Sequence, residues 1–477
     1  MDKFENLLMD FYELTMGQGY FDKHIENETA YFDVFFRKVP DGGSFVIANG
    51  ISKCVEYLLQ FHFEPSDIEY LESLNLFSKE YLQKLTSIRF TGDMWAVEDG
   101  TIVFPNEPVI TIKSGLLEAQ LIETALLLYF NRSSLITTKA NRIVRSARGR
   151  AVMEFGTRRA QGFEAAVDGA KDAYVAGAVG TACTITGKNY GVPVLGTMAH
   201  SFVQSFDTEY ESFKAYAESF PDACTLLVDT YNTLKSGIPN AIRVNNEVLK
   251  PMGKELKGIR IDSGDLAYLS KKARIMLDQA GLKNTKIVVS NSLDENIIES
   301  LLLQNAPIDS FGVGENLITA KSNPVFGGVY KLVAIEKDGK IIPKIKISDN
   351  IEKITNPHFK KIYRLVDNTS GKFVTDIISI FDEPKPEGKI TLLHPTNAWT
   401  NKVIDNYSVR EIKIKMIENG KLIFSLPTLE ETRKKVQAEL NTLWDEALRL
   451  SNPHKYIINL SPQLSRLKSN LLEEHLN

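Results

Sequence analysis

Strand-like and helix-like segments alternate between residues 151 and 313, and this alternation restricts the fold more than any other feature of the chain. Short apolar runs typical of buried strands occur at residues 151–155, 192–195, 226–229, 258–262, 286–290 and 309–313. Helical patterns separate most of them, as where Leu266, Leu269 and Ala273 precede Gly281. Repeated strand–helix units predict parallel strands and an α/β fold. We expect an irregular parallel α/β barrel, with a doubly wound open sheet as the competing geometry.

The chain on either side of this region has an α+β character. Residues 29–36 and 44–49 are rich in β-branched and aromatic residues, and the turn residues between them indicate a hairpin. Strand signals return from residue 328 to about residue 424, with long polar breaks. We therefore predict an N-terminal α+β domain at residues 1–135 that is completed by about residues 331–427, and a barrel at residues 136–330.

The C-terminal segment, residues 428–477, is expected to be a helical tail. Thr428 and Glu431 have the spacing of a capping box at the start of a helix. Val436, Leu440 and Leu443 would share one apolar face of that helix.

Composition and charge narrow the class of protein. The formal net charge is −4, from 56 basic and 60 acidic side chains, so neither a nucleic-acid partner nor a membrane surface is indicated. The three cysteines have neither disulfide nor zinc spacing, which favours a reducing cytoplasm. Residues 1–6 show no apolar run of a signal peptide, and no apolar span of membrane length occurs later.

Polar residues gather where the predicted strands end, and parallel strands place those ends together. Arg158 and Arg159 follow the first strand, Asp229 ends the third, and Arg260 and Asp262 lie on the same side of the fourth. Asp265 is expected to cap the next helix. Glycines at Gly312, Gly314, Gly327 and Gly328 could expose backbone amides to a phosphate, although tight loops also use glycine. The arginines would be costly to desolvate without anions, so a multiply anionic ligand is expected.

His200 lies between the strand-like run at residues 192–195 and a segment that is expected to form a helix from residue 201 to about 217. A histidine at such a junction can act as an acid or base near neutral pH. It could equally be a capping or core histidine. The neighbouring arginines favour a role at an anion site.

Five stretches of the chain carry a resemblance to a known family: DFYELTM (10–16), EFGTRRAQG (154–162), GTMAHS (196–201), IRIDSGDL (259–266) and FGGVYKLV (326–333). In this order they resemble nicotinate phosphoribosyltransferase, a type II phosphoribosyltransferase family. The resemblance implies a barrel beside an α+β domain built from both chain ends. It also implies a homodimer with active sites shared between the subunits.

The reaction implied by the resemblance joins nicotinate to phosphoribosyl pyrophosphate and releases nicotinate mononucleotide and pyrophosphate. ATP hydrolysis is coupled to it, Mg²⁺ is bound with the substrate rather than by a protein metal site, and the pathway is NAD salvage. His200 would be the histidine that ATP phosphorylates. Arg260 and Asp262 would join it as catalytic residues, with Asp262 near the ribose, Mg²⁺ or pyrophosphate.

The resemblance also assigns substrate contacts. Phe155 and Tyr12 would sandwich the pyridine ring, with Tyr12 supplied by the partner subunit. Arg158, Thr197 and Arg260 would surround the carboxylate and phosphates. The loops for the 5′-phosphate would contain Gly312, Gly314, Gly327 and Gly328.

Two departures from the related nicotinamide enzymes bear on the substrate. Those enzymes have an aspartate after the Gly-Thr pair, where this chain has Ala182 after Gly180 and Thr181. An acid there would repel nicotinate, so its absence favours the acid over the amide. Ala199 replaces the glutamate that precedes the histidine, which leaves the assistance of ATP hydrolysis open. The alternatives are a sister enzyme using nicotinamide or quinolinate, and a catalytically silent nucleotide-binding barrel.

Overall fold

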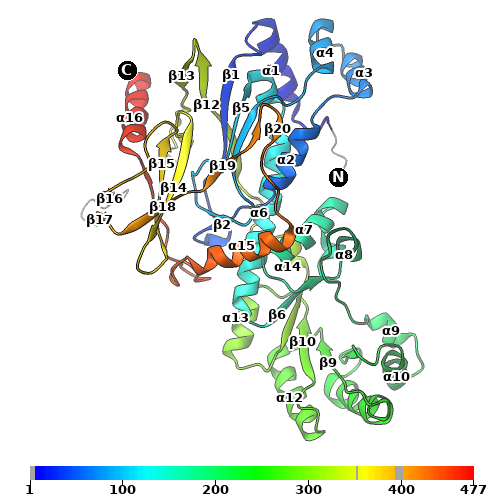
Figure 1. The fold of residues 1–477 in the computed structure, drawn as a ribbon. Coiled ribbons are helices and arrows are strands. Elements are labelled where there is room, and N and C mark those ends of the chain that lie inside the picture. The colour runs from blue at the N-terminus through cyan, green and yellow to red at the C-terminus, as the bar shows by residue number, and fades with distance from the viewer. Residues whose placement is uncertain (1–5, 351–352, 393–400, 477) are drawn as a thin grey trace. The chain divides into compact units, whose positions relative to one another are not determined.

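The computed structural model describes residues 6–350, 353–392 and 401–476. Two compact units divide the chain: one contains the segments before residue 136 and after residue 324, and the other contains residues 136–324. Figure 1 shows the central unit in cyan-green to green and the unit made from both ends in blue to cyan and in yellow to red. Residues 1–5, on which most of the signal-peptide prediction rests, lie outside the described residues.

The central unit is built on a six-stranded sheet whose pairs are all parallel. This confirms the predicted parallel α/β organisation. The strand order is β7-β6-β11-β10-β9-β8. Their bounds are β6 (Ala151–Glu154), β7 (Gly180–Thr181), β8 (Thr225–Leu227), β9 (Gly258–Ile261), β10 (Lys286–Ser290) and β11 (Ser310–Val313).

The expected barrel is not closed, because β7 and β8 lie at the two edges of the sheet. The strands otherwise follow one another around the sheet in chain order, and β11 pairs back to β6. The expected strand at residues 192–195 is a single parallel bridge between Val194 and Thr181. Pro193 has no N–H to donate, which limits a ladder here. The result is the strand order of a barrel with one unpaired seam.

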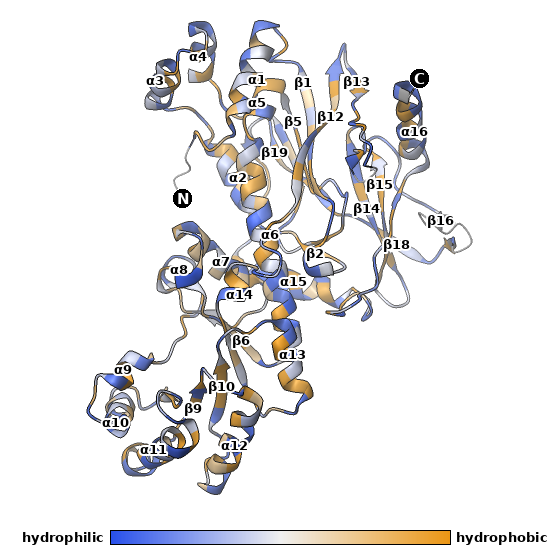
Figure 2. Cartoon of the chain, turned by 180° about the vertical axis from the view of Figure 1, so that it is seen from behind, coloured by the Kyte–Doolittle hydropathy of each residue, from blue (hydrophilic) through white to orange (hydrophobic). Residues whose placement is uncertain are grey.

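Helices connect the strands of the central unit. They are the C-terminal half of α6 (Glu123–Ser146), α7 (Phe163–Val175), α8 (Thr184–Tyr190), α9 (His200–Gln204), α10 (Glu209–Ser219), α11 (Ile238–Val244), α12 (Leu266–Gln279), α13 (Glu295–Leu303) and α14 (Glu315–Ile318). Figure 2 shows hydrophobic and hydrophilic residues along α12, which is consistent with one buried face.

Two helix predictions in this unit have different outcomes. Asp265 caps α12 as expected, since its carboxylate accepts from the Tyr268 N–H at 2.9 Å. The single helix expected from residue 201 to about 217 is wrong: α9 ends at Gln204 and α10 starts at Glu209. Thr208 interrupts the helix because it forms a reciprocal capping box with Glu211.

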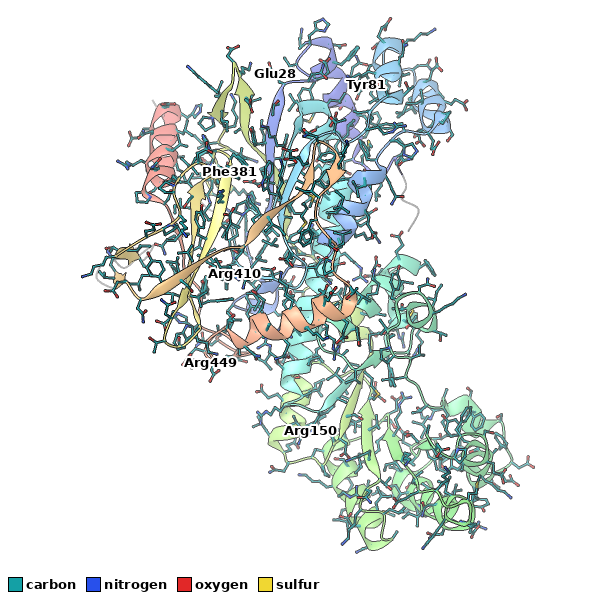
Figure 3. The ribbon with its side chains drawn as sticks, in the orientation of Figure 1. Glu28, Tyr81, Arg150, Phe381, Arg410 and Arg449 are labelled. Atoms are coloured by element: carbon teal, nitrogen blue, oxygen red, sulfur yellow. The ribbon has the colours of Figure 1, made fainter. Side chains whose placement is uncertain are left out.

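The other unit contains a seven-stranded sheet of order β13-β12-β1-β5-β3-β19-β20, in which both chain ends pair with each other. Its strands are β1 (Thr29–Phe36), β3 (Asp93–Val97), β5 (Ile110–Gly115), β12 (Gly328–Lys337), β13 (Lys340–Pro343), β19 (Lys413–Glu418) and β20 (Lys421–Leu422). Tyr31 of β1 and Val333 of β12 are buried in one cluster with Phe359. Phe381, labelled in Figure 3, stacks on Phe359 with ring centroids 3.9 Å apart.

The predicted hairpin of residues 29–36 and 44–49 is wrong. β1 pairs with β5 and β12, whereas β2 (Val46–Ile47) pairs with β4 (Ile102–Val103). The chain between them contains a short 3₁₀ turn in which Asp41 has a φ of 54°, and this turn redirects the backbone. β1 is buried from Ala30 to Phe36, so it requires neighbours on both sides.

The remaining elements of this unit are a four-stranded sheet, two short strand pairs and several helices. The sheet contains β14 (Lys360–Asp367), β15 (Phe373–Ile380), β18 (Tyr407–Glu411) and β21 (Ile458–Leu460), and β16 (Ile390–Leu392) pairs with β17 (Lys402–Ile404). The helices are α1 (Phe11–Asp22), α2 (Ile51–Gln60), α3 (Pro65–Ser73), α4 (Lys79–Thr86), α5 (Leu116–Gln120), α15 (Leu429–Asn441) and α16 (Pro462–Leu476).

Thr428 starts α15 through the expected capping box with Glu431. A buried ion-pair network ties this helix to the four-stranded sheet. Arg364 pairs with Asp376 at 2.6 Å and with Glu439 of α15 at 3.2 Å. Arg410 on β18, labelled in Figure 3, also pairs with Glu439. Among the described residues, no helix is long and apolar enough to span a membrane.

Candidate active site

A cavity of about 290 Å³ lies in the central unit, where the parallel strands end. Residues at the ends of β6, β9, β10 and β11, together with residues of α14 and the segment after it, line the cavity. These are Phe155, Arg158, Arg159, Arg260, Asp262, Ser290, Asn291, Ser292, Gly312, Gly314, Glu315, Asn316 and Lys321. The carboxyl ends of parallel strands are where α/β proteins generally place ligands.

Arg260 and Asp262 form the centre of the polar lining. Arg260 is on β9, and Asp262 directly follows that strand on the same side. The Arg260 guanidinium donates from Nη2 to Asp262 at 2.9 Å, from Nη1 to the Thr197 hydroxyl at 3.2 Å, and from Nε to the Ser290 hydroxyl at 2.8 Å. These three hydrogen bonds fix the orientation of the planar guanidinium.

His200 approaches this centre from the start of α9. Its Nε2 lies 3.8 Å from an Asp262 oxygen, and its Nδ1 is 3.0 Å from the Thr230 hydroxyl. The imidazole is 41% exposed, so a large group could reach it. Asp229 lies two residues after β8 and accepts from the Asp262 backbone N–H at 3.0 Å, which fixes the turn after β9.

The turn after β6 places Phe155 and two arginines on the cavity. Glu154 anchors it from inside, since the buried carboxylate accepts from the Gly156 N–H and from the Thr181 hydroxyl. Burial raises the pKa of Glu154. The following 3₁₀ turn (Thr157–Arg159) presents exposed Arg158 and Arg159. The Arg260 guanidinium lies 5.5 Å from the centre of the Phe155 ring.

Gly312 and Gly314 allow the Phe155 segment to pack closely on β11. A Cβ at Gly312 would lie 2.6 Å from the Phe155 ring, and one at Gly314 would lie 3.1 Å from the Phe155 carbonyl oxygen. Any side chain at Gly312 would therefore displace the ring. Both glycines line the cavity with backbone rather than side chain.

The structure brings together most of the residues that the sequence singled out. Phe155, Arg158, Arg260, Asp262, Gly312 and Gly314 line the cavity. Thr197 and His200 are not part of its lining but contact Arg260 and Asp262.

Tyr12, Gly327 and Gly328 belong to the other unit. Tyr12 is 44% exposed on α1, and partial burial with nearby Glu123 raises the pKa of its hydroxyl. Burial also raises the pKa of the adjacent Glu13 to about 7. A Cβ at Gly328, the first residue of β12, would lie 2.0 Å from the Asn131 side-chain oxygen.

Several lining residues were not among the predicted site residues. Ser290 ends the predicted strand at residues 286–290 and Asn291 directly follows it, and that position was the available signal. Asn291 and Ser292 have φ values of 89° and 53°, so they form a strained turn, which the sequence does not predict. No sequence pattern indicated that Lys321, paired with Glu315 at 2.6 Å, would reach the cavity. Within the described ranges, no group of three or more His, Cys, Asp or Glu residues could hold a metal ion.

Comparison with known proteins decides the family. Three family models match this chain. The model of the nicotinate phosphoribosyltransferase N-terminal domain matches residues 7–131, that of the nicotinate phosphoribosyltransferase family matches residues 150–366, and that of the C-terminal domain matches residues 359–468. A nicotinate phosphoribosyltransferase of Bacillus subtilis is 41% identical over 96% of this chain and 93% of its own length. This chain belongs to the nicotinate phosphoribosyltransferase family. A human member is 30% identical over 98% of this chain and 96% of its own length.

The solved structures agree with the family assignment. The crystal structure of human nicotinic acid phosphoribosyltransferase matches with a TM-score of 0.86, at 29% identity, over 98% of this chain and all of that chain. A nicotinate-nucleotide pyrophosphorylase from Pyrococcus furiosus matches with a TM-score of 0.69 at 22% identity, over 93% of this chain and 99% of that one. The second likeness concerns the fold alone.

Proposed function

We propose that this chain transfers the phosphoribosyl group of phosphoribosyl pyrophosphate to nicotinate, the first step of NAD salvage from nicotinate. The observation that carries the proposal is the cavity itself. It combines three arginines and Lys321 with the carboxylates of Asp262 and Glu315 and the Phe155 ring, at the carboxyl end of a parallel sheet. In this family such a lining suits a polyanionic sugar and a flat anionic ring.

The chemistry requires positive charge around the leaving group and an acid near the sugar. The bond between ribose C1 and pyrophosphate breaks as the nicotinate ring nitrogen bonds to C1, so positive charge grows on the ribose. Arg158, Arg159 and Arg260 would neutralise the phosphates and the carboxylate. The Asp262 carboxylate would stabilise the cationic sugar, because electrostatic stabilisation of developing charge is a major source of catalysis.

The nicotinate ring would lie on Phe155. The face of this ring borders the cavity beside Arg260, which suits an aromatic anion. We propose that Tyr12 of a partner subunit covers the other face, in a homodimer with shared sites. The glycines Gly312, Gly314, Gly327 and Gly328 are proposed to surround the 5′-phosphate. Thr197 would assist Arg260 through their hydrogen bond.

ATP coupling is proposed to act through His200. Its imidazole is exposed and lies beside Asp262, so a phosphoryl group on it would add charge next to the pyrophosphate position. The partly exposed Asp262 carboxylate fits Mg²⁺, which commonly takes one or two protein carboxylates together with substrate phosphates. Bound Mg²⁺ would neutralise charge on the pyrophosphate. We also propose a cytoplasmic location.

Selectivity for the acid over the amide is proposed to follow from Ala182. It comes directly after β7, and its N–H donates to the Glu154 carbonyl oxygen at 2.9 Å, so its position is fixed next to the Phe155 turn. Alanine there brings no negative charge that would repel the nicotinate carboxylate.

Release of pyrophosphate from phosphoribosyl pyrophosphate tests this function. Purified protein with Mg²⁺ and ATP should release it only when nicotinate is present. No nicotinate-dependent release would refute the proposal and favour a silent nucleotide-binding protein. Release that depends on nicotinamide or quinolinate instead would identify a sister enzyme.

A further inference from the structure

Ser290 lies at the point where two charged residues of the cavity, Arg260 and Asp262, meet. It is the last residue of β10, only 3% exposed, and part of the cavity lining. Its hydroxyl accepts from Arg260 Nε at 2.8 Å and donates to Asp262 Oδ1. Neither contact was expected from the sequence.

The hydrogen-bond chemistry explains why a hydroxyl is suited to this position. An arginine offers only donors, and an ionised aspartate offers only acceptors. A serine hydroxyl can accept from the first and donate to the second at the same time. Together with the direct Arg260–Asp262 contact at 2.9 Å, it closes a ring of three hydrogen bonds. Both charged side chains therefore lose the freedom to rotate.

The ring also determines which groups remain for a substrate. Asp262 Oδ1 accepts from both Ser290 and Arg260, whereas Oδ2 is the oxygen that lies 3.8 Å from His200. The Arg260 guanidinium uses Nε on Ser290 and one N–H on each of Asp262 and Thr197, and two of its five N–H groups are left for a ligand.

We propose that Ser290 is a positioning residue for phosphoribosyl transfer, which orients Arg260 and Asp262 so that Asp262 Oδ2 and the remaining guanidinium N–H groups face the reacting substrate. This inference rests on the proposed function. Ser290 acts through its two neighbours rather than on the substrate. Because misplacement by about 1 Å can reduce a rate by ~100-fold, loss of the hydroxyl should lower turnover.

Kinetics of three variants test the role. Ser290→Ala should lower kcat roughly 10- to 100-fold and change the KM for nicotinate much less, because orientation matters most in the transition state. Ser290→Thr keeps the hydroxyl and should recover most of kcat, since a β-branched side chain is compatible with the strand conformation of β10. Ser270→Ala is the control: Ser270 is a buried serine on α12 that donates to the Ala267 carbonyl.

A second measurement does not depend on activity. In the ¹⁵N spectrum of arginine-labelled protein, the Arg260 Nε–H should be protected from solvent exchange in wild type and Ser290→Thr. It should exchange rapidly in Ser290→Ala, and its assignment follows from loss of the signal in Arg260→Lys. This readout still reports on the contact if the threonine variant is poorly active.

The outcomes separate the two proposals. A wild-type protein that forms no nicotinate mononucleotide would overturn the proposed function. An active wild type whose Ser290→Ala variant matches Ser270→Ala in kcat, or keeps the Arg260 Nε–H protected, would overturn only the role of Ser290.

Discussion

At the scale of single residues, Arg260 is the best-defined member of the site. Arg260→Lys keeps the charge but cannot reach Asp262, Thr197 and Ser290 at once. Hydrogen bonds to charged groups contribute about 1.5–3 kcal/mol each, so loss of two should lower kcat/KM by about 100-fold or more. Steady-state kinetics with nicotinate check this. The control Arg243→Lys, on the exposed face of α11, should behave as wild type, and equal activity of both variants would contradict the assignment.

His200 should be required for phosphoryl transfer from ATP but not for the glycosyl transfer itself. We expect His200→Ala to lose acid-labile label from γ-labelled ATP and to retain slow transfer at high substrate concentration. His62→Ala, a histidine hydrogen-bonded to Glu64 in the other unit, serves as the control and should be labelled normally. Label that persists in His200→Ala would show that another residue accepts the phosphoryl group.

At the scale of elements, the helical turn before α11 (Thr233–Gly237) packs closely on the residue that follows β8. A Cβ at Gly237, next to the start of α11, would lie 1.8 Å from the Val228 carbonyl oxygen. Gly237→Ala should therefore shift this backbone and lower the free energy of unfolding by about 1–3 kcal/mol or more. Gly19→Ala in α1 is a matched control, because nothing lies within 4 Å of its Cβ. It should be neutral or slightly stabilising, and equal denaturation midpoints would contradict the packing argument.

Sequence patterns predicted the central strands well because their apolar runs are short and end in polar residues. β10 matches the expected residues 286–290, and β6, β9 and β11 differ by one residue. β8 (Thr225–Leu227) is shifted from the expected residues 226–229, and the two-residue β7 was not predicted. Patterns failed where pairing partners decide the structure. β1 pairs with β12, which is distant in the sequence, and Val194 forms one bridge instead of a strand. Neither local hydrophobicity nor turn residues encode such distant partners.

The site was predicted in part for the same reason. Strand ends identified Arg260 and Asp262, since period-two alternation places them on one face. Thr230 contacts His200, and Lys321 lines the cavity. Both positions depend on the conformation of the loops at the end of the sheet. Such loop geometry is not periodic, so the sequence alone could not place these residues.

At the scale of the whole molecule, a buried charged network should make stability depend on pH. Lys413 donates to Thr111 at 2.7 Å, Thr111 donates to Asp33 at 2.6 Å, and Lys360 pairs with Asp33 at 2.8 Å. The Asp33 carboxylate thus interacts with the buried amine of Lys360 directly and with that of Lys413 through Thr111. Burial lowers the pKa of Lys413 to about 7.

The sign of the effect follows from this lowered pKa. Between the folded value of about 7 and the unfolded value of about 10.4, only the unfolded chain holds the Lys413 proton. Stability from this group is therefore fully present above about pH 10.4 and is lost as the pH falls towards 7. Lys413→Met should stabilise the protein most at pH 7 and progressively less towards pH 10.

Urea denaturation of wild type and Lys413→Met at pH 7, 8.5 and 10 measures this difference. Lys415→Met is a suitable control on the same strand, because nearby Asp93 and Glu418 raise the pKa of Lys415. The control should not show stabilisation at pH 7. A stability difference for Lys413→Met that stays constant with pH would contradict the network.

The most direct test of the central claim is the rate of mononucleotide formation from phosphoribosyl pyrophosphate with nicotinate, nicotinamide and quinolinate side by side, with and without ATP. The account predicts that nicotinate has the highest kcat/KM and that ATP increases its use. A higher kcat/KM for nicotinamide or quinolinate, or no product from any of the three, would contradict it.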